Sequence, residues 1–261
     1  MEPAQKRAAC DFLYQHWLRG TRVDALPQPF LPRDRAEAYE VQACIEAYTK
    51  VPLYGWKIAA TSVAGQKHIG VDGPLAGRIL AERVIENGGS CALGTNLMKV
   101  AEMEFAFRMA RDLPPRAEHY SQEEVLSHVG SLHPAIEIPD SRYNHFESVG
   151  LASLVADNAC AHRFLLGEAV ADWRGLDLAK HQVRAYRNGA LAEEGVGSNV
   201  LGDPRFALTW LVNELSRHGV TLKAGEVVTT GTCVKPVVIE ANQRIEGDFG
   251  SCGRVAIEIT P

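Results

Sequence analysis

The apolar positions of the first fifty residues repeat with the 3.6-residue period of an α-helix. This spacing predicts a helix over residues 4–19, and three prolines between residues 27 and 32 then interrupt the chain. Asp34 is a typical N-cap, and the apolar period resumes after it to about residue 50. We therefore expect two helices within residues 1–52.

From Tyr54 onward the apolar period shortens to two residues, which is typical of β-strands. A capping box at Ser121-Gln-Glu-Glu124 predicts a short helix to about residue 129, and Asp203-Pro204 begins a predicted helix over 204–218. Asn188-Gly189 predicts a hairpin turn, and Gly and Pro at residues 70–77 predict a loop. Strands are predicted at residues 54–60, 98–109 and 135–138, and near 226–231, 236–240, 244–249 and 254–259.

Helices followed by a strand-rich segment indicate the α+β class. We expect an N-terminal helical lobe over residues 1–52 and a mixed β body over 53–261, together forming a single catalytic unit over 1–261. With 261 residues, 46% of them hydrophobic, the chain is long enough for one sizeable core.

Composition excludes several classes of function. The formal net charge is −5 and no long basic run is present, so we expect no nucleic-acid partner. No apolar run reaches the roughly 20 residues of a membrane span, and the first residues lack the apolar centre of a signal peptide. The six cysteines are scattered, without a C-x-x-C pair, and are expected to be reduced thiols of a cytoplasmic protein.

Three glutamates occupy positions where a β-strand would bury them. Glu102 and Glu104 lie two residues apart in strand 98–109, so their side chains share one face with Cα atoms about 6.5–7 Å apart. Glu137 interrupts the apolar strand at 135–138. Buried carboxylates close together need a cation, and a hard divalent ion prefers oxygen ligands. The alternative is a solvated strand face with exposed glutamates.

Several other polar residues are candidates for substrate contact. Lys57 stands inside the apolar segment Trp56-Lys57-Ile58, where a buried amine needs an anion nearby. Hydroxyls such as those of Ser62 and Ser141 either contact a substrate carboxylate or cap the backbone. Asp157 and Asn158 either line the site or cap a helix end. Asp140 is expected to cap a turn or to pair with Arg142.

Six stretches in register carry a resemblance over about residues 35–259. They are Gly55-Trp-Lys57-Ile-Ala-Ala-Thr61-Ser62, Ala101-Glu102-Met-Glu104-Phe-Ala-Phe107, Pro134-Ala-Ile-Glu137-Ile-Pro-Asp140-Ser141-Arg142, Asp157-Asn158-Ala-Cys160, Gly202-Asp-Pro204 with Trp210-Leu211, and Gly225-Glu-Val-Val-Thr-Thr-Gly231-Thr232. Together they resemble the fumarylacetoacetate hydrolase superfamily, and within it the 2-oxopent-4-enoate hydratase and 4-oxalocrotonate decarboxylase branch.

The resemblance implies a mixed β-roll body, a homo-oligomer, and Mg²⁺ or Mn²⁺ held by Glu102, Glu104 and Glu137. It further suggests Lys57 as a catalytic residue and Thr232 as a substrate contact, beside the candidates Ser62, Ser141, Asp157 and Asn158.

One loop departs from the pattern of the branch. Hydratases of this group usually read Pro-Asp-aromatic-Gly after the lysine strand, and that Asp is a candidate acid or base. This chain reads Pro74-Leu75-Ala76-Gly77, with Leu75 at the Asp position. Asp72, three residues earlier, is then the acidic residue to consider as a second catalytic group.

The function implied is hydration of a 2-hydroxy-2,4-dienoate to a 4-hydroxy-2-oxo acid. A decarboxylase of the 4-oxalocrotonate type would use the same metal and the same electron sink, and a non-catalytic binder of 2-oxo acids would keep only the metal site. Cleavage of a C–C bond in acylpyruvates is a further alternative, and the chain shows no clear counterpart of the His/Glu pair used by hydrolases of the superfamily.

Overall fold

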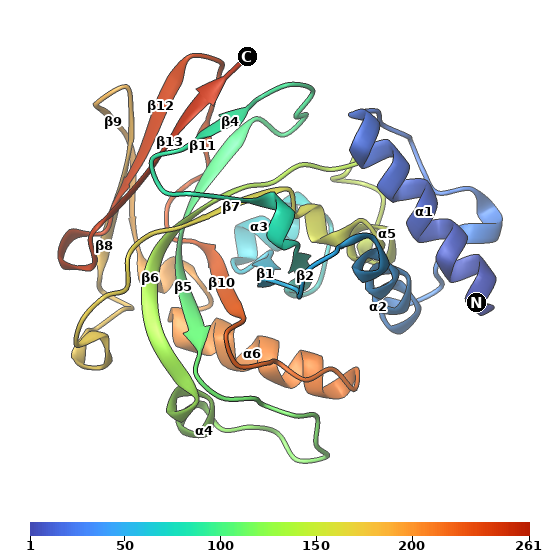
Figure 1. Ribbon diagram of the computed structural model, residues 1–261, viewed down its shortest axis with the longest axis horizontal. Helices are drawn as coiled ribbons and strands as arrows, with labels where there is room; N and C mark the ends of the chain where they lie inside the picture. Colours follow the sequence, from blue (N-terminus) through green and yellow to red (C-terminus); the bar gives the residue numbers. More distant parts are fainter.

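A large curled sheet forms the centre of the molecule in the computed structural model, which describes residues 1–261 (Figure 1). Its strands mix parallel and antiparallel pairs, and the short strand β11 joins it beside β5. In pairing order the strands are β2 (Leu75–Ile79), β1 (Gly55–Ala59), β10 (Val227–Thr232), β5 (Val100–Met109), β6 (Val129–Ile138), β7 (Arg163–Leu166) and β3 (Val84–Ile85), with β11 (Val237–Val238) off this path.

A second sheet of five strands packs beside the first, on the left of Figure 1. Its order is β4 (Ser90–Ala92), β13 (Arg254–Thr260), β12 (Gln243–Asp248), β8 (Gln182–Arg187) and β9 (Ala190–Val196). The β8–β9 turn has positive φ at both Asn188 (51°) and Gly189 (79°), as a type I′ hairpin requires. The predicted hairpin is therefore confirmed.

The helices lie mainly on the opposite side of the large sheet (Figure 1). They are α1 (Pro3–Arg19), α2 (Arg35–Ala43), α3 (Val63–His68), α4 (Gln122–Ser127), α5 (Leu151–Ala156) and α6 (Pro204–Arg217). Buried residues of α1, α2 and both sheets belong to one hydrophobic cluster, so the N-terminal helices share the core of the β body. The boundary predicted near residue 52 stays a prediction. No helix combines the length and apolar character that spanning a bilayer requires.

The α+β class and most predicted elements are confirmed. The Asp34 side chain accepts a hydrogen bond from the Glu37 amide, and the capping box of Ser121 and Glu124 forms as expected. The second helix is shorter than predicted, because α2 ends at Ala43 and a 3₁₀ turn, Cys44–Tyr48, replaces its last part.

The loop predicted over residues 70–77 is wrong in its last part, because β2 begins at Leu75. Gly77 lies within this strand and pairs with Lys57 of β1. A Cβ atom on Gly77 would lie 2.4 Å from the Asn158 carbonyl oxygen and 3.1 Å from the Lys57 side chain. This glycine therefore marks a close approach of backbone segments inside a strand, and not a turn.

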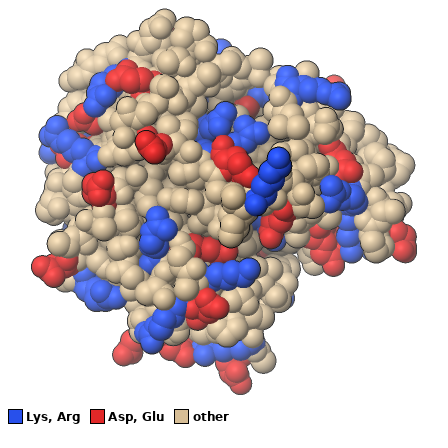
Figure 2. Space-filling view, viewed as in Figure 1, with Lys and Arg blue, Asp and Glu red and all other residues tan.

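Charges of both signs are interspersed on the face drawn in Figure 2. Lys and Arg side chains there alternate with Asp and Glu side chains, so this face carries no extended patch of a single sign.

A hydrogen bond between Trp17 and His162 connects α1 to the start of β7. The indole Nε1 of Trp17 donates to Nδ1 of His162 over 2.7 Å. Guanidinium groups of Arg83 and Arg142 lie 4.2 and 5.0 Å from the Trp17 ring. Burial lowers the pKa of His162 to about 2, and the nearby arginines lower it further in the same direction. His162 is therefore a neutral hydrogen-bond acceptor in the folded protein.

This depressed pKa predicts a loss of stability in mild acid. Below about pH 6.5 the unfolded chain binds a proton on His162 that the folded protein does not bind, so the free energy of unfolding falls as the pH falls. In His162→Gln the side-chain oxygen can still accept from Trp17, but the group no longer titrates. Between pH 7 and pH 5, the free energy of unfolding of this variant is expected to fall by about 2 kcal/mol less than that of the wild type.

Urea unfolding at a series of pH values measures this difference, with His119→Gln at an exposed position as the control. Equal pH dependence of the wild type and His162→Gln would contradict the assignment of a neutral His162.

Candidate active site

Pairing of β5 with β6 brings the three glutamates together. Glu102 and Glu137 are direct partners across this antiparallel pair, and Glu104 lies one step further along the same face of β5. A carboxylate oxygen from each residue can be chosen so that all three lie within 4.8 Å of one another. Glu104 and Glu137 are buried and Glu102 is partly exposed.

Hydrogen bonds fix only one side of the Glu104 carboxylate. Its Oε2 accepts from the Thr229 hydroxyl at 2.5 Å and from the Gly231 amide at 2.7 Å. Gly231 adopts φ 104°, and a Cβ there would lie 1.9 Å from the Thr61 hydroxyl, so this position requires glycine. The other oxygen of Glu104, Oε1, is buried without any hydrogen-bond partner. An unsatisfied buried carboxylate oxygen is costly and indicates a missing ligand.

Lys57 supplies the positive charge nearest to these carboxylates. Its Nζ lies 3.1 Å from Oε2 of Glu137 and donates to the Ala159 carbonyl oxygen over 3.0 Å. Burial alone would lower the pKa of Lys57, but the carboxylates of Glu137, Glu102 and Glu104 raise it above its usual range. Lys57 is therefore a charged ammonium in this site.

One ammonium does not balance three carboxylates. Desolvation raises the pKa of Glu137 to about 7, against the opposing effect of Lys57, and it raises the pKa of Glu104 well above its usual range. Desolvation also raises the pKa of Glu102. A divalent cation would bind the ionised carboxylates and satisfy Oε1 of Glu104. The all-oxygen set of donors fits a hard ion such as Mg²⁺ or Mn²⁺.

The carbonyl group that holds Lys57 belongs to an unusual turn. Asn158, Ala159 and Cys160 all adopt left-handed φ values, of 55°, 48° and 61°, which are unfavourable for residues other than glycine. The Asn158 side chain stabilises this turn, because Oδ1 accepts from the Arg78 amide at 2.6 Å and Nδ2 donates to the Arg78 carbonyl at 2.8 Å. The side-chain amide of Asn158 thus satisfies the backbone amide and carbonyl groups of Arg78 at the free edge of β2.

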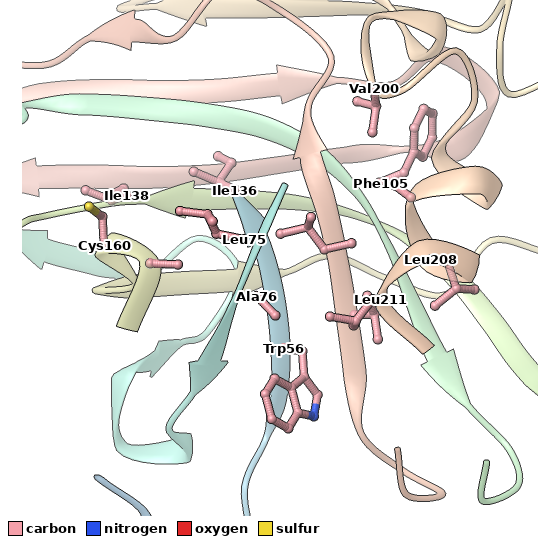
Figure 3. Packing of buried hydrophobic residues seen from close by; sticks show 14 of the residues in the cluster. Trp56, Leu75, Ala76, Phe105, Ile136, Ile138, Cys160, Val200, Leu208 and Leu211 are labelled. Atoms are coloured by element: carbon pink, nitrogen blue, oxygen red, sulfur yellow. The ribbon is translucent and has the colours of Figure 1, made fainter. Parts of the chain in front are cut away.

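A cavity of about 600 Å³ opens beside this cluster. Lys57 and Glu102 line its inner end, and the hydroxyl-bearing residues Thr61, Ser62 and Thr232 line it as well. Half of its lining residues are hydrophobic, including Leu75 and Cys160, which Figure 3 shows among the packed apolar side chains. The site therefore combines a polar inner end with largely apolar walls.

The structure brings most of the predicted site residues together. Glu104 and Glu137 lie directly behind Glu102 and Lys57, and Ser62 and Thr232 reach the cavity. Ser62 also caps α3 by accepting a hydrogen bond from the Gly65 amide.

Asp72 is not brought to the cavity. Its side chain is 92% exposed, lies 3.8 Å from Arg35, and does not line the cavity. The segment that carries it precedes β2, whose first residue, Leu75, does reach the cavity wall.

Ser141 and Asp157 form a buried network outside the cavity lining. The Ser141 hydroxyl donates to Asp157 at 2.8 Å, and Asp157 pairs with the Arg142 guanidinium. The Asp140 carboxylate pairs with Arg22 and accepts from the Leu97 amide at 2.8 Å, whereas the Arg142 guanidinium donates only to the Asp140 backbone carbonyl. Of the two expectations for Asp140, the side-chain pair with Arg142 is wrong, and capping of the backbone by the side chain is confirmed. These residues, with Asn158, support the turn that holds Lys57.

Sequence reasoning missed Lys235, which lines the cavity together with His68. Lys235 follows Thr232 in the short connection between β10 and β11, and both of these strands pair with β5. The strands on either side of this connection were predicted, but their pairing partners were not. Only their pairing with residues 98–109 would have placed Lys235 close to Glu102.

An α+β fold with three clustered carboxylates beside an open cavity is the arrangement expected of a metal-dependent enzyme. The chain matches the family Fumarylacetoacetate (FAA) hydrolase C-terminal over residues 85–260. It belongs to the fumarylacetoacetate hydrolase family, in the branch of 2-oxopent-4-enoate hydratases and 4-oxalocrotonate decarboxylases.

Two curated relatives and one solved structure illustrate this placement. The 2-keto-4-pentenoate hydratase of Paraburkholderia xenovorans (strain LB400) is 30% identical over 99% of this chain and 96% of its own length. The 4-oxalocrotonate decarboxylase of Pseudomonas sp. (strain CF600) is 31% identical over 80% of each chain. The solved 4-oxalocrotonate decarboxylase from Pseudomonas putida G7, in complex with magnesium and adipate, superposes with a TM-score of 0.90 at 25% identity, over 99% of this chain and 98% of that one.

Glu104→Gln is expected to weaken binding of Mn²⁺ or Mg²⁺ by at least about 100-fold, because it removes one of three charged oxygen ligands. Titration calorimetry measures the affinity, and circular dichroism checks the fold. Glu118→Gln at an exposed position is the matched control. Unchanged metal affinity in Glu104→Gln would contradict the ligand set.

Asn158→Ala is expected to lower the free energy of unfolding by about 3 kcal/mol, because it leaves the buried amide and carbonyl of Arg78 without partners. Urea unfolding measures the loss. Asn242→Ala, at an exposed position with φ 64°, controls for backbone strain. A loss no larger than that of the control would refute the role assigned to the Asn158 side chain.

Proposed function

We propose that this protein is a divalent-metal-dependent lyase that hydrates a 2-hydroxy-2,4-dienoate of the 2-oxopent-4-enoate type. The observation that carries the proposal is the position of the three-glutamate cluster. Glu104 and Glu137 are buried behind Glu102 and Lys57, and these two residues form the inner end of the cavity. A small 2-oxo acid entering the cavity would meet oxygen ligands and an ammonium group at the same end.

Glu102, Glu104 and Glu137 would hold Mg²⁺ or Mn²⁺. When bound, such an ion supplies Lewis-acid stabilisation of the negative charge that develops on an enolising 2-oxo acid. This assignment is supported by Oε1 of Glu104, because a buried carboxylate oxygen needs a partner and this one has none in the protein.

Lys57 would orient the substrate and polarise one of its oxygens. An ammonium group has three N–H donors. One is donated to the Ala159 carbonyl, and the group also forms an ion pair with Glu137, which leaves donor capacity for a substrate oxygen at the cavity wall. Because its neighbours raise the pKa of Lys57 above the usual range, its role at the inner end is to hold a positive charge and not to release a proton.

The overall reaction adds one water molecule to the dienol. A proton is added at the far end of the diene while the 2-hydroxyl group loses its proton, which gives a conjugated 2-oxo enoate. Water then adds across the C3=C4 bond, with its hydroxyl at C4 and its proton at C3, giving a 4-hydroxy-2-oxo acid. Thr61, Ser62 and Thr232 line the cavity and offer hydroxyl groups that could hold this water. The hydroxyl proton of Thr232 is donated to the Val234 carbonyl, so its oxygen is left as an acceptor.

Decarboxylation is a second candidate, and Lys235 favours it. This residue lines the cavity at an exposed position, and Glu102 is the only acidic residue among the lining residues. A positive group at the exposed part of the cavity would suit a second substrate carboxylate that stays in contact with solvent, which a decarboxylase of the 4-oxalocrotonate type releases as carbon dioxide. Relatives named for each of the two reactions support both candidates.

Ultraviolet spectroscopy of purified protein with Mg²⁺ tests the proposal. Freshly generated 2-hydroxypenta-2,4-dienoate should lose its absorbance band and yield a 4-hydroxy-2-oxo acid, and EDTA should abolish the reaction. Carbon dioxide release from 4-oxalocrotonate alone would instead establish the decarboxylase. No turnover of either compound, with Mg²⁺-dependent oxalate binding intact, would indicate a binder and overturn the proposed activity.

Lys57→Met tests the ammonium group apart from the metal ligands. It keeps the three glutamates but removes the positive charge that would stabilise a substrate oxygen, and we expect kcat to fall by at least about 100-fold. Lys180→Met, at an exposed position, is the control. Full activity of Lys57→Met would contradict the role given to Lys57.

A further inference from the structure

The cavity is much larger than the smallest substrate of the proposed reaction. Its volume of about 600 Å³ lies within the roughly 300–1,000 Å³ typical of pockets for drug-sized ligands. An unsubstituted five-carbon dienoate would fill only the inner end beside Glu102 and Lys57. The rest of the volume is therefore available to a substituent on the substrate.

An apolar wall begins directly beside Lys57. Lys57 pairs with Gly77 across β1 and β2, and Ala59 pairs with Leu75 one step further along the same face. Leu75 is fully buried and lines the cavity. The first surface that a substrate meets beyond Lys57 is thus hydrocarbon.

This wall continues away from the carboxylates through three other elements. Leu154 of α5 is fully buried, Phe146 is 8% exposed, and Ile69 follows α3 directly. All three line the same cavity as Leu75. The Phe146 ring lies 6.1 Å from the ring of His68, so the apolar wall extends outward to the α3 side of the cavity.

The charged groups of the cavity are poorly placed to stabilise a carboxylate against this wall. Lys57 is already paired with Glu137, and Lys235, the other lysine that lines the cavity, is exposed to solvent. A carboxylate beside Leu75 and Leu154 would lose its hydration without gaining a buried partner, which is costly. An uncharged hydrocarbon group has no such cost, and its burial is favourable.

We propose that the preferred substrate carries an apolar, uncharged substituent, alkyl or aryl, at the end of the diene remote from its carboxylate. The substituent packs against Leu75, Ile69, Phe146 and Leu154. This inference rests on the proposed lyase function. It assigns to that function a substrate with an apolar end and not a dicarboxylic substrate.

A series of substrates tests the inference. The Mg²⁺-loaded protein is assayed with 2-hydroxy-2,4-dienoates that carry hydrogen, methyl, propyl, phenyl or carboxylate at C5. We expect kcat/KM to rise roughly three- to fourfold for each methylene that enters the apolar wall, and the carboxylate to be the poorest substrate. A flat or falling alkyl series, or a preference for the carboxylate, would overturn the inference.

Substitutions in the wall should change this selectivity. Phe146→Ala is expected to lower the ratio of kcat/KM for the propyl substrate to that for the unsubstituted one by at least about fivefold. Ile69→Thr, which keeps the β-branch but is smaller and adds a hydroxyl group, provides a second variant should Phe146→Ala fold poorly. Phe206→Ala, at a position 55% exposed on α6, is the control and should keep the wild-type ratio. Wild-type selectivity in both wall variants would refute the assignment.

A binding measurement separates this inference from the proposed activity. Calorimetry with Mg²⁺ and unbranched 2-oxo acids of increasing chain length reports on the apolar wall without turnover. If affinity rises with chain length while no dienoate reacts, the apolar site stands and the lyase function fails. If dienoates react but neither affinity nor kcat/KM depends on chain length, the lyase function stands and the apolar site fails.

Discussion

The pairing of two carboxylates across the centre of a buried sheet is the constraint on which the site depends. Glu102 and Glu137 are register partners on β5 and β6, and Glu104 lies beside them. Their mutual repulsion and loss of hydration must be offset locally. Lys57, the Thr229 hydroxyl and the Gly231 amide offset part of this cost. Oε1 of Glu104 and Oε2 of Glu137 still have no hydrogen-bond partner, and this makes the cluster suitable for a cation.

The network around Lys57 explains why several polar residues predicted for the site are absent from the cavity surface. Ser141 and Asp157 hold Arg142, and Asn158 holds the edge of β2. These groups stabilise the turn whose Ala159 carbonyl fixes the ammonium group. Positioning one buried charge in a low-dielectric interior thus requires several buried polar side chains whose own hydrogen bonds are satisfied.

Much of the fold could be predicted from local pattern, whereas parts of the site could not. Alternation along residues 98–109 and the cap at Asp203 act within a few residues, and they predicted β5 and α6 correctly. Leu75–Ile79 forms a strand because it pairs with β1 and because Gly77 packs closely against Asn158. These contacts are distant in sequence, so the local Gly and Pro residues predicted a loop instead. For the same reason Asp72 was expected near the site and Lys235 was not, since each position is set by partners distant in sequence.

The left-handed turn at Asn158–Cys160 also bears on how the molecule acquires its site during folding. Its stabilising partner, Arg78, is 80 residues away, and the group that it orients, Lys57, is 102 residues from Ala159. Contacts of such long sequence separation form only after costly loop closure. The turn cannot hold its strained conformation until β1 and β2 are in place. Assembly of the charged centre is therefore coupled to completion of the tertiary structure, and a partly folded chain would have the glutamates without an oriented Lys57.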